Sequence, residues 1–527
     1  MHALRATFHV AKANLRVRLR DRRLLAVVAG CVYLGHLVLA GDIELVLAGQ
    51  DYRGVENAAW IGTLMSLTAS FVVLLFGFYL VSGALDRDRQ ARLGPLIASS
   101  PVGSLAYLLG TWVGSTLFLL CLVGVMAASA AGLFMLRGHG VPPPGPLLAP
   151  FVLFTSPVAA MTAAVALAFE CLPGLRGRMG SVVYFFLALG TLILPIAGSF
   201  PFDPLGMTTL HESMTAALLA QHPDATPGAM FAFGYFKEVG SLTPFEWSGV
   251  AATADVVGQR LGVVLASLGL VAGAGVFFRR FDPSPEGWAQ YRRWAGDLIS
   301  ADAAQSSPAP SEPSDSLSSD PLSDDTGDES PGLSLAALSG KRRLRPLRLI
   351  GAELKLALRD RSWGWGVGAL GLIAAGLIWP DNGGLLILAW LWPMTLWSAL
   401  GTRATVHRTA PLLATSLYPR AQQIAAWAAG ALVAFGMGVG PLLLEGQWGV
   451  LVGATFVPAL ALAAGRLAGT PRLFEVTFLL LWYLGPANRQ AVLDFSGVTT
   501  APTATLTGYL GAAVVLLGIT VMGRRSP

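Results

Sequence analysis

The sequence predicts an all-α membrane protein with about twelve transmembrane helices, arranged as two six-span halves that are each preceded by an amphipathic interfacial helix. Three observations lead to this fold class: the composition, the placement of Lys and Arg, and an internal repeat. Of the 527 residues, 54% are hydrophobic and only 13% are charged, and the mean hydropathy is +0.60. A water-soluble chain of this length needs more polar residues to cover its surface, so we expect the lipid bilayer to be the solvent.

Apolar stretches long enough to span a bilayer occur throughout the chain, since roughly 20 residues of helix cross the hydrocarbon core. In the first half, the stretches that we expect to span lie at residues 24–41, 60–84, 105–135, 148–170, 180–200 and 250–278. In the second half, where Gly, Pro and short loops interrupt the pattern, they lie at residues 363–379, 384–402, 421–443, 448–465, 473–486 and 503–522. The cysteines Cys31, Cys121 and Cys171 are scattered among these stretches, and their spacing predicts neither a disulfide framework nor a metal site.

The placement of Lys and Arg agrees with a count of twelve spans. If the N-terminus is inside and every span crosses, the inside segments carry 31 of the 36 Lys and Arg residues. Basic residues concentrate on the cytoplasmic side of membrane spans, so we expect both termini to be cytoplasmic in a multi-pass protein of the plasma (inner) membrane. No cleavable signal peptide is evident before the first span. Lipid headgroups and the membrane potential account for the basic residues, so no nucleic-acid partner is expected.

A repeated motif divides the chain into two halves. Leu15-Arg-Val-Arg-Leu-Arg-Asp-Arg22 returns as Leu354-Lys-Leu-Ala-Leu-Arg-Asp-Arg361, 339 residues later. We therefore expect a first transmembrane half at residues 1–281, a linker at 282–340 and a second transmembrane half at 341–527. Residues 301–332 of the linker contain eight acids and no Lys or Arg. Such an acidic segment, rich in Ser and Pro, is typical of a disordered cytoplasmic tether.

Each copy of the motif lies just before the first span of its half, and apolar and basic residues recur there at helical spacing. This pattern favours an amphipathic helix at the inner membrane interface. The matched residues of the two helices are Arg20, Asp21, Arg22, Arg359, Asp360 and Arg361.

A second repeat follows the second span of each half. Pro-Leu-Ile-Ala-Ser-Ser begins at Pro95, and Pro-Leu-Leu-Ala-Thr-Ser begins at Pro411. We name residues 85–104 the first inner segment and residues 403–420 the second inner segment, and expect each to form a short cytoplasmic helix with an apolar patch. The residues that we single out there are Asp86, Arg87, Arg92, Leu93, Pro95, Leu96, Ile97, Ser99, Pro101, Arg408, Pro411, Leu412, Leu413 and Ser416.

At these residues the chain resembles the membrane subunit of type-2 ABC exporters. The resemblance rests on the charged segment that runs into Leu93–Pro101 and on the third span that follows it. It implies an interfacial helix and six spans in each half, and an inner segment that docks on a separate ATPase subunit, with two copies of the ATPase expected. The second inner segment lacks the acids and ends in Leu417-Tyr418-Pro419, and both halves are fused in one chain where the family usually dimerises a six-span subunit.

Two other classes of protein are alternatives. Major facilitator secondary transporters share the six-plus-six layout, and Gly83-Ala-Leu-Asp86-Arg87-Asp88-Arg89 is similar to their signature but departs from it twice. A membrane-embedded enzyme needs convergent nucleophiles or metal ligands, and no such cluster is evident. The chain has no G-x-x-x-x-G-K-[ST] motif to hold nucleotide phosphates, so any ATP hydrolysis is expected on a partner chain, and no cofactor is expected.

Polar residues at membrane depth are the candidates for contact with a transported substrate. They are His36 in the first span, Glu170 at the inner end of the fourth and Asp255 at the outer start of the sixth. The spacing of His211, Glu212, His222 and Asp224 in the outer loop matches no standard metal site. Because the spans contain few charges, we expect a hydrophobic or amphipathic substrate, whose identity the sequence does not give.

Overall fold

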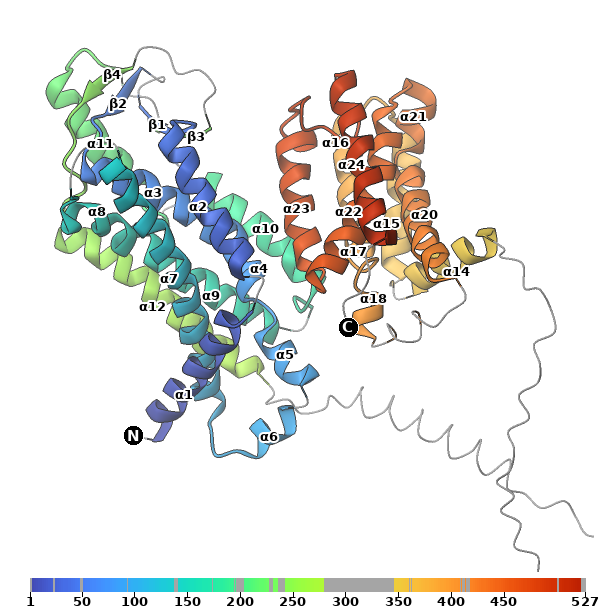
Figure 1. Ribbon diagram of the computed structural model, residues 1–527, viewed down its shortest axis with the longest axis horizontal. Coiled ribbons are helices and arrows are strands. Elements are labelled where there is room, and N and C mark those ends of the chain that lie inside the picture. The colour runs from blue at the N-terminus through green and yellow to red at the C-terminus, as the bar shows by residue number, and fades with distance from the viewer. Residues whose placement is uncertain are drawn as a thin grey trace, which may run out of the picture.

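The computed structural model describes residues 2–21, 24–47, 51–91, 93–136, 141–172, 174–193, 195, 203–226, 231–235, 242–278, 346–359, 361, 363–407, 409, 413, 418–499 and 502–522. Most of these residues are helical and few are in strands, which confirms the all-α fold class. The predicted linker at 282–340 lies outside the described residues. Figure 1 shows the helices as two bundles side by side, one built from the first half (blue to green) and one from the second (yellow to red).

The first half begins with the interfacial helix α1 (His2–Leu19), which packs along α7. The helices that follow are α2 (Leu24–Ala40), α3 (Ala58–Val72), α4 (Phe78–Val81), α5 (Ala84–Gln90), α6 (Gly94–Ser99), α7 (Ser104–Leu136), α8 (Pro144–Pro150), α9 (Ser156–Cys171), α10 (Arg178–Ile193), α11 (Met207–Gln221) and α12 (Ala254–Phe277). Two π-helical turns, η2 (Val73–Gly77) and η3 (Phe151–Thr155), join α3 to α4 and α8 to α9.

The second half begins with a second amphipathic helix, α14 (Pro346–Arg359). The helices that follow are α15 (Trp363–Ile378), α16 (Gly383–Leu391), α17 (Met394–Trp397), α18 (Arg403–Val406), α20 (Pro419–Met437), α21 (Val439–Glu445), α22 (Gly449–Ala468), α23 (Arg472–Trp482) and α24 (Thr503–Met522). A third π-helical turn, η4 (Tyr483–Ala487), extends α23.

All twelve predicted spans fall on helical segments, but they differ in length. Within the described residues, six helices are long and apolar enough to cross a membrane, or seven if α20 and α21, which meet at a 59° bend, form one span. Four shorter apolar helices, at Leu24–Val38, Met179–Ile193, Trp363–Ile378 and Gly383–Trp397, match other predicted spans. The chain is therefore a membrane-spanning helical protein, and the count of twelve crossings stays a prediction.

Two small sheets, which the sequence did not indicate, join the segment between α2 and α3 to the segment between α11 and α12. β1 (Ile43–Val46) pairs antiparallel with β3 (Ala232–Tyr235), and β2 (Tyr52–Gly54) pairs parallel with β4 (Thr243–Phe245). The buried rings of Phe245 and Trp247 pack edge-on against Trp60 at the start of α3, with centroids 5.8 and 6.0 Å away. These sheets lie at the end of the first half opposite to α1, α5 and α6 (Figure 1).

Two helices, α10 and α23, connect the halves, and each is the fifth predicted span of its half. Phe185 of α10 belongs to the apolar core of the second half, whereas Val476 of α23 belongs to the core of the first. The ring of Phe186 meets Trp482 edge-on at 5.9 Å. The two cores are thus held together by a reciprocal exchange of side chains between equivalent spans.

Candidate functional site at the first inner segment

The first inner segment begins where the second predicted span breaks. α4 ends at Val81, and α5 begins after Gly83, whose φ of 80° is in the left-handed region that glycine adopts without strain. Such a break exposes backbone carbonyls at the end of one helix and backbone amides at the start of the next. Three charged side chains from distant parts of the chain bind these groups, and they define the candidate site.

Glu170, at the end of α9, binds the amides. Its carboxylate accepts hydrogen bonds from the N–H groups of Gly83, Ala84 and Leu85, the last two at 3.1 and 2.8 Å. α5 has no capping side chain of its own, so Glu170 takes that role from another helix. A carboxylate at a helix N-terminus is stabilised both by these donors and by the helix dipole.

Arg18, near the end of α1, binds two of the carbonyls. Its guanidinium donates to the oxygens of Leu80 at 2.8 Å and Val81 at 2.6 Å, while its Nε donates to Asn14 Oδ1 at 2.9 Å. The side chain is buried between α1, α4 and α7. Burial, and then the neighbouring Arg87, lower the pKa of Arg18 to about 9, so the guanidinium stays protonated at neutral pH.

Arg472, the first residue of α23, binds the third carbonyl and comes from the other half. Its Nη1 donates to the carbonyl oxygen of Ser82. The guanidinium occupies the space where a Cβ atom on Gly83 would lie. It also interacts electrostatically with Glu170. We call Ser82, Gly83 and Ala84, with Glu170 and Arg472, the Gly83 junction.

α5 is fixed to the membrane helices by two further contacts. Arg87 donates from Nη2 to Asn14 Oδ1 of α1 at 3.2 Å, and the Tyr107 hydroxyl of α7 donates to Asp88 Oδ2. The predicted Asp86 forms an i,i+3 ion pair with Arg89 at 2.9 Å on the surface. α5 is therefore held on α1, α7 and α9 together.

α6, in contrast, presents apolar side chains to the outside. Leu96 is 67% exposed and Leu93 is 41% exposed, whereas Ile97 is half-buried against the core that contains Tyr107 and Leu108. Ser99 and Pro101 are exposed, and Ser99 Oγ donates to the carbonyl of Leu96 at 3.1 Å. Arg92 and the side chain of Pro95 lie outside the described residues. Leu93 and Leu96 therefore form an exposed apolar surface next to the anchored helix α5.

The second inner segment makes a related but simpler contact. Arg403, at the start of α18, pairs with Glu353 of α14 at 3.4 Å, and Gln422 of α20 donates to the same carboxylate at 3.3 Å. Leu413 is half-buried. Four residues predicted for this segment lie outside the described residues: Arg408, Pro411, Leu412 and Ser416.

The two contacts obey the spacing of the sequence repeats. Asn14 and Glu353 are 339 residues apart, like the two Arg-Asp-Arg motifs, and Arg87 and Arg403 are 316 residues apart, like Pro95 and Pro411. In both halves, a buried polar residue of the interfacial helix binds an arginine eight positions before the repeated proline. The paired residues thus occupy matching positions of the two sequence repeats, and each pair is in contact.

The remaining predicted residues of the interfacial helices are less uniform. Arg20 and Arg359 are exposed, Asp21 begins the turn into α2, and Arg22 and Asp360 lie outside the described residues. Arg361 donates to the hydroxyl and carbonyl oxygens of Thr395, at 3.3 and 3.1 Å, and so ties α14 to α17.

Of the three substrate-contact candidates, only Glu170 is buried. His36 is exposed on α2, and Asp255 is exposed at the start of α12, where it accepts a hydrogen bond from Gln259 at 3.1 Å. Glu170 is engaged by the backbone of the Gly83 junction. Sequence reasoning did not single out Asn14, Arg18 or Arg472. Arg18 lies in the repeated motif, but alanine replaces it in the second copy, so the repeat gave no signal for it.

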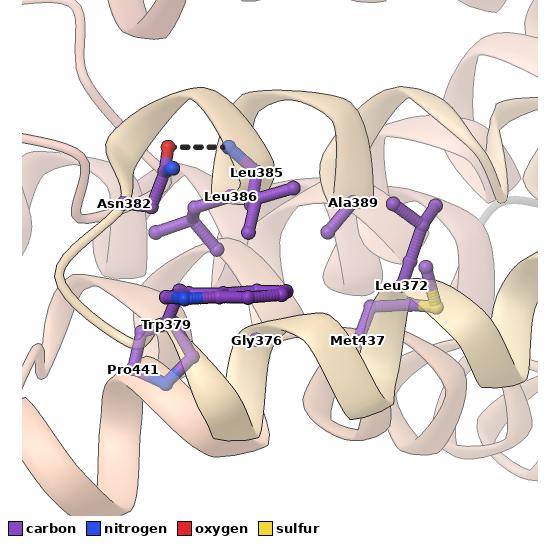
Figure 2. Close-up of a pocket in the computed structure, with 9 residues that line it drawn as sticks. All are labelled: Leu372, Gly376, Trp379, Asn382, Leu385, Leu386, Ala389, Met437 and Pro441. Atoms are coloured by element: carbon purple, nitrogen blue, oxygen red, sulfur yellow. Dashed lines mark hydrogen bonds between the residues drawn. The ribbon is translucent and has the colours of Figure 1, made fainter.

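No second candidate site appears in the described part of the chain. The pocket in Figure 2, lined by Leu372, Trp379, Leu386 and Met437 among others, has no interior space for even a water molecule. Among the described residues, no group of three His, Cys, Asp or Glu side chains could hold a metal ion. Comparison of the whole chain with protein families, with characterised proteins and with solved structures finds no match.

Proposed function

We propose that this chain is the permease subunit of an ATP-binding cassette transporter that exports a hydrophobic or amphipathic substrate and is driven by a separate ATPase subunit. The observation that carries the proposal is the contrast within the first inner segment. α5 is anchored to α1, α7 and α9, while Leu96 of α6 and Leu93, the residue before α6, are exposed. A segment with this construction can receive force at an apolar patch and transmit it to several membrane helices.

The duplicated contacts support two docking positions. Each half has an inner segment tied to its interfacial helix by an arginine at the same repeat position. We propose that each position receives one copy of the ATPase, on the cytoplasmic side of the plasma (inner) membrane, with both termini of the chain on that side. The substrate then passes between the halves, which meet along α10 and α23.

Substitution of the exposed leucine tests the proposal. An apolar anchor in a partner's pocket contributes about 2 kcal/mol or more. Leu96→Asp should therefore release the ATPase or uncouple its hydrolysis from transport, and Leu412→Asp should do so less strongly because the second segment is the more divergent. Val141→Asp, at an exposed apolar residue before α8, is the control for charge insertion. Correct membrane insertion of each variant is checked separately.

If the Leu96→Asp, Leu412→Asp double variant binds and couples the ATPase as the parent does, the docking site is wrong. Transport that continues in vesicles without ATP and follows an imposed proton gradient would instead favour the major facilitator type of secondary transporter.

A further inference from the structure

At the Gly83 junction, Arg472 of the second half donates a hydrogen bond to a backbone carbonyl of the first half. Three successive carbonyls, those of Leu80, Val81 and Ser82, accept hydrogen bonds from the guanidinium groups of Arg18 and Arg472. The three amides that follow are bound by Glu170. Each of the six consecutive residues from Leu80 to Leu85 thus has one backbone group bound by a charged side chain from α1, α9 or α23.

The geometry points to Arg472 as a positioning residue that ties the first inner segment to α23, so that a displacement of α5 is transmitted directly to the second half. This inference rests on the proposed function for its purpose, but the bond itself can be tested without an ATPase. Arg472 is the N-terminal residue of α23, whose far end packs against α10 through Trp482 and Phe186. We therefore expect a displacement of Ser82 to move Arg472 and, with it, α23, the helix that joins the two cores.

A comparison of Arg472 with Arg18 and Glu170 explains why Arg472 is suited to this role. Arg18 and Glu170 belong to the first half, so they fix the end of α4 and the start of α5 relative to their own bundle only. Arg472 reaches the same break from a residue 390 positions away in the sequence. Gly83 leaves the space that the guanidinium fills, because a Cβ atom there would overlap it. The described part of the second inner segment has a different construction, in which Arg403 and Glu353 both belong to the second half.

Amide hydrogen exchange of the purified full-length chain in detergent tests the inference, with residues 82–90 and residues 472–482 as the two reporters. A hydrogen bond to a charged group limits local opening, so Arg472→Gln should speed exchange about tenfold in both reporters. Arg472→Lys, which keeps the charge and one donor, should lie between the parent and Arg472→Gln. Arg420→Gln, at an exposed arginine of α20, should leave both reporters unchanged.

Transmission, as distinct from local stability, requires a second variant. Glu170→Gln weakens the binding of α5 from within the first half, and we expect it to speed exchange in residues 472–482 as well. In the Arg472→Gln background, the same change should add nothing to the exchange of residues 472–482, because the connection is already broken. This non-additivity is the result that the inference predicts.

Two results would overturn the inference: exchange of residues 82–90 within about twofold of the parent in both Arg472 variants, or an equal effect of Glu170→Gln on residues 472–482 with and without Arg472. Neither result depends on ATPase docking. Conversely, a Leu96→Asp variant that keeps its ATPase would disprove the docking site and leave the exchange data intact.

Discussion

At the scale of the residue, the geometry of the candidate site depends most on Gly83. The backbone at Gly83 is left-handed, and the Arg472 guanidinium fills the space that a Cβ atom would occupy. The contributions of these two features to stability can be measured separately. Gly177, in the loop before α10, has nearly the same φ of 82° against 80° at Gly83, but no atom lies within 4 Å of the place of its missing Cβ. Gly177→Ala is therefore a matched control that reports the free-energy cost of a left-handed alanine alone.

Gly83→Ala should destabilise the chain more than Gly177→Ala. A left-handed alanine costs about 1 kcal/mol in either place. At Gly83 the added methyl group also displaces the Arg472 guanidinium, which removes a charged hydrogen bond worth about 1.5–3 kcal/mol. In an Arg472→Ala background, the two glycine substitutions should cost the same. The measurement is the denaturation temperature in detergent of the parent and the five variants, and equal effects of Gly83→Ala in both backgrounds would refute the displacement of Arg472.

Sequence reasoning at this scale found Glu170 but not what it binds. An acid near a span end stands out in an apolar chain, so hydropathy alone drew attention to it. Its partners at Gly83, Ala84 and Leu85 are about 85 residues away, and backbone amides carry no sequence signal. Arg472 was missed for a related reason, because an arginine at the inner end of a span is what the positive-inside rule predicts anywhere.

At the scale of the element, the interfacial helices α1 and α14 were predicted from apolar and basic residues at helical spacing. The structure adds the means by which each is fixed to its bundle. Asn14 binds Arg87, and Glu353 binds Arg403 and Gln422. The Glu353 and Arg403 side chains are only 10% and 19% exposed, so solvent screens this ion pair less than one on the surface.

Glu353→Gln should loosen α14 from α18 and α20. It keeps the shape of the side chain and removes its charge, and we expect a loss of about 1 kcal/mol, at the upper end of the range for exposed pairs. Faster amide exchange in residues 346–359 would report the loss. Glu445→Gln, at an exposed glutamate of α21, is the matched control, and a Glu353→Gln variant that exchanges no faster than this control would argue against the anchoring role.

Span boundaries were predicted closely where the apolar run is uninterrupted. The stretch at 503–522 coincides with α24 (Thr503–Met522), and that at 105–135 differs from α7 (Ser104–Leu136) by one residue at each end. The breaks were not predicted. The 59° bend between α20 and α21 falls at Gly438, inside a run that hydropathy reads as continuous. β1 to β4 pair residues up to about 190 positions apart, and segments of three or four residues are too short for a periodic signal.

At the scale of the whole molecule, the repeat predicted two halves but not how they meet. The contact between α10 and α23 joins equivalent spans, and Phe185 and Val476 each enter the core of the other half. Both residues look like ordinary apolar positions of a membrane span, so the sequence does not distinguish an interface between halves from a face toward lipid. Only the three-dimensional arrangement distinguishes the interface between the halves from a face toward lipid.

The predicted topology places the small sheets and the inner segments on opposite sides of the membrane. In a background without the three native cysteines, Thr243→Cys on β4 should react with a membrane-impermeant maleimide added outside intact cells. Ser99→Cys on α6 should react only after the inner face is exposed. Thr243 and Ser99 are both exposed in the structure, so reactivity reports sidedness. Three predicted spans, at residues 105–135, 148–170 and 180–200, lie between Ser99 and Thr243, so the two positions should be on opposite sides. Labelling of both from the same side would disprove this topology.

The central claim is that α6 docks on an ATPase, and a photo-reactive amino acid at Leu96 in the full-length chain in its native membrane tests it most directly. Val141, which is 83% exposed and lies between α7 and α8, is the control position. We predict that Leu96, and not Val141, cross-links to a protein that carries a G-x-x-x-x-G-K-[ST] motif and hydrolyses ATP when purified. Failure to obtain an ATPase adduct at Leu96, or the same adduct at both positions, would contradict the claim.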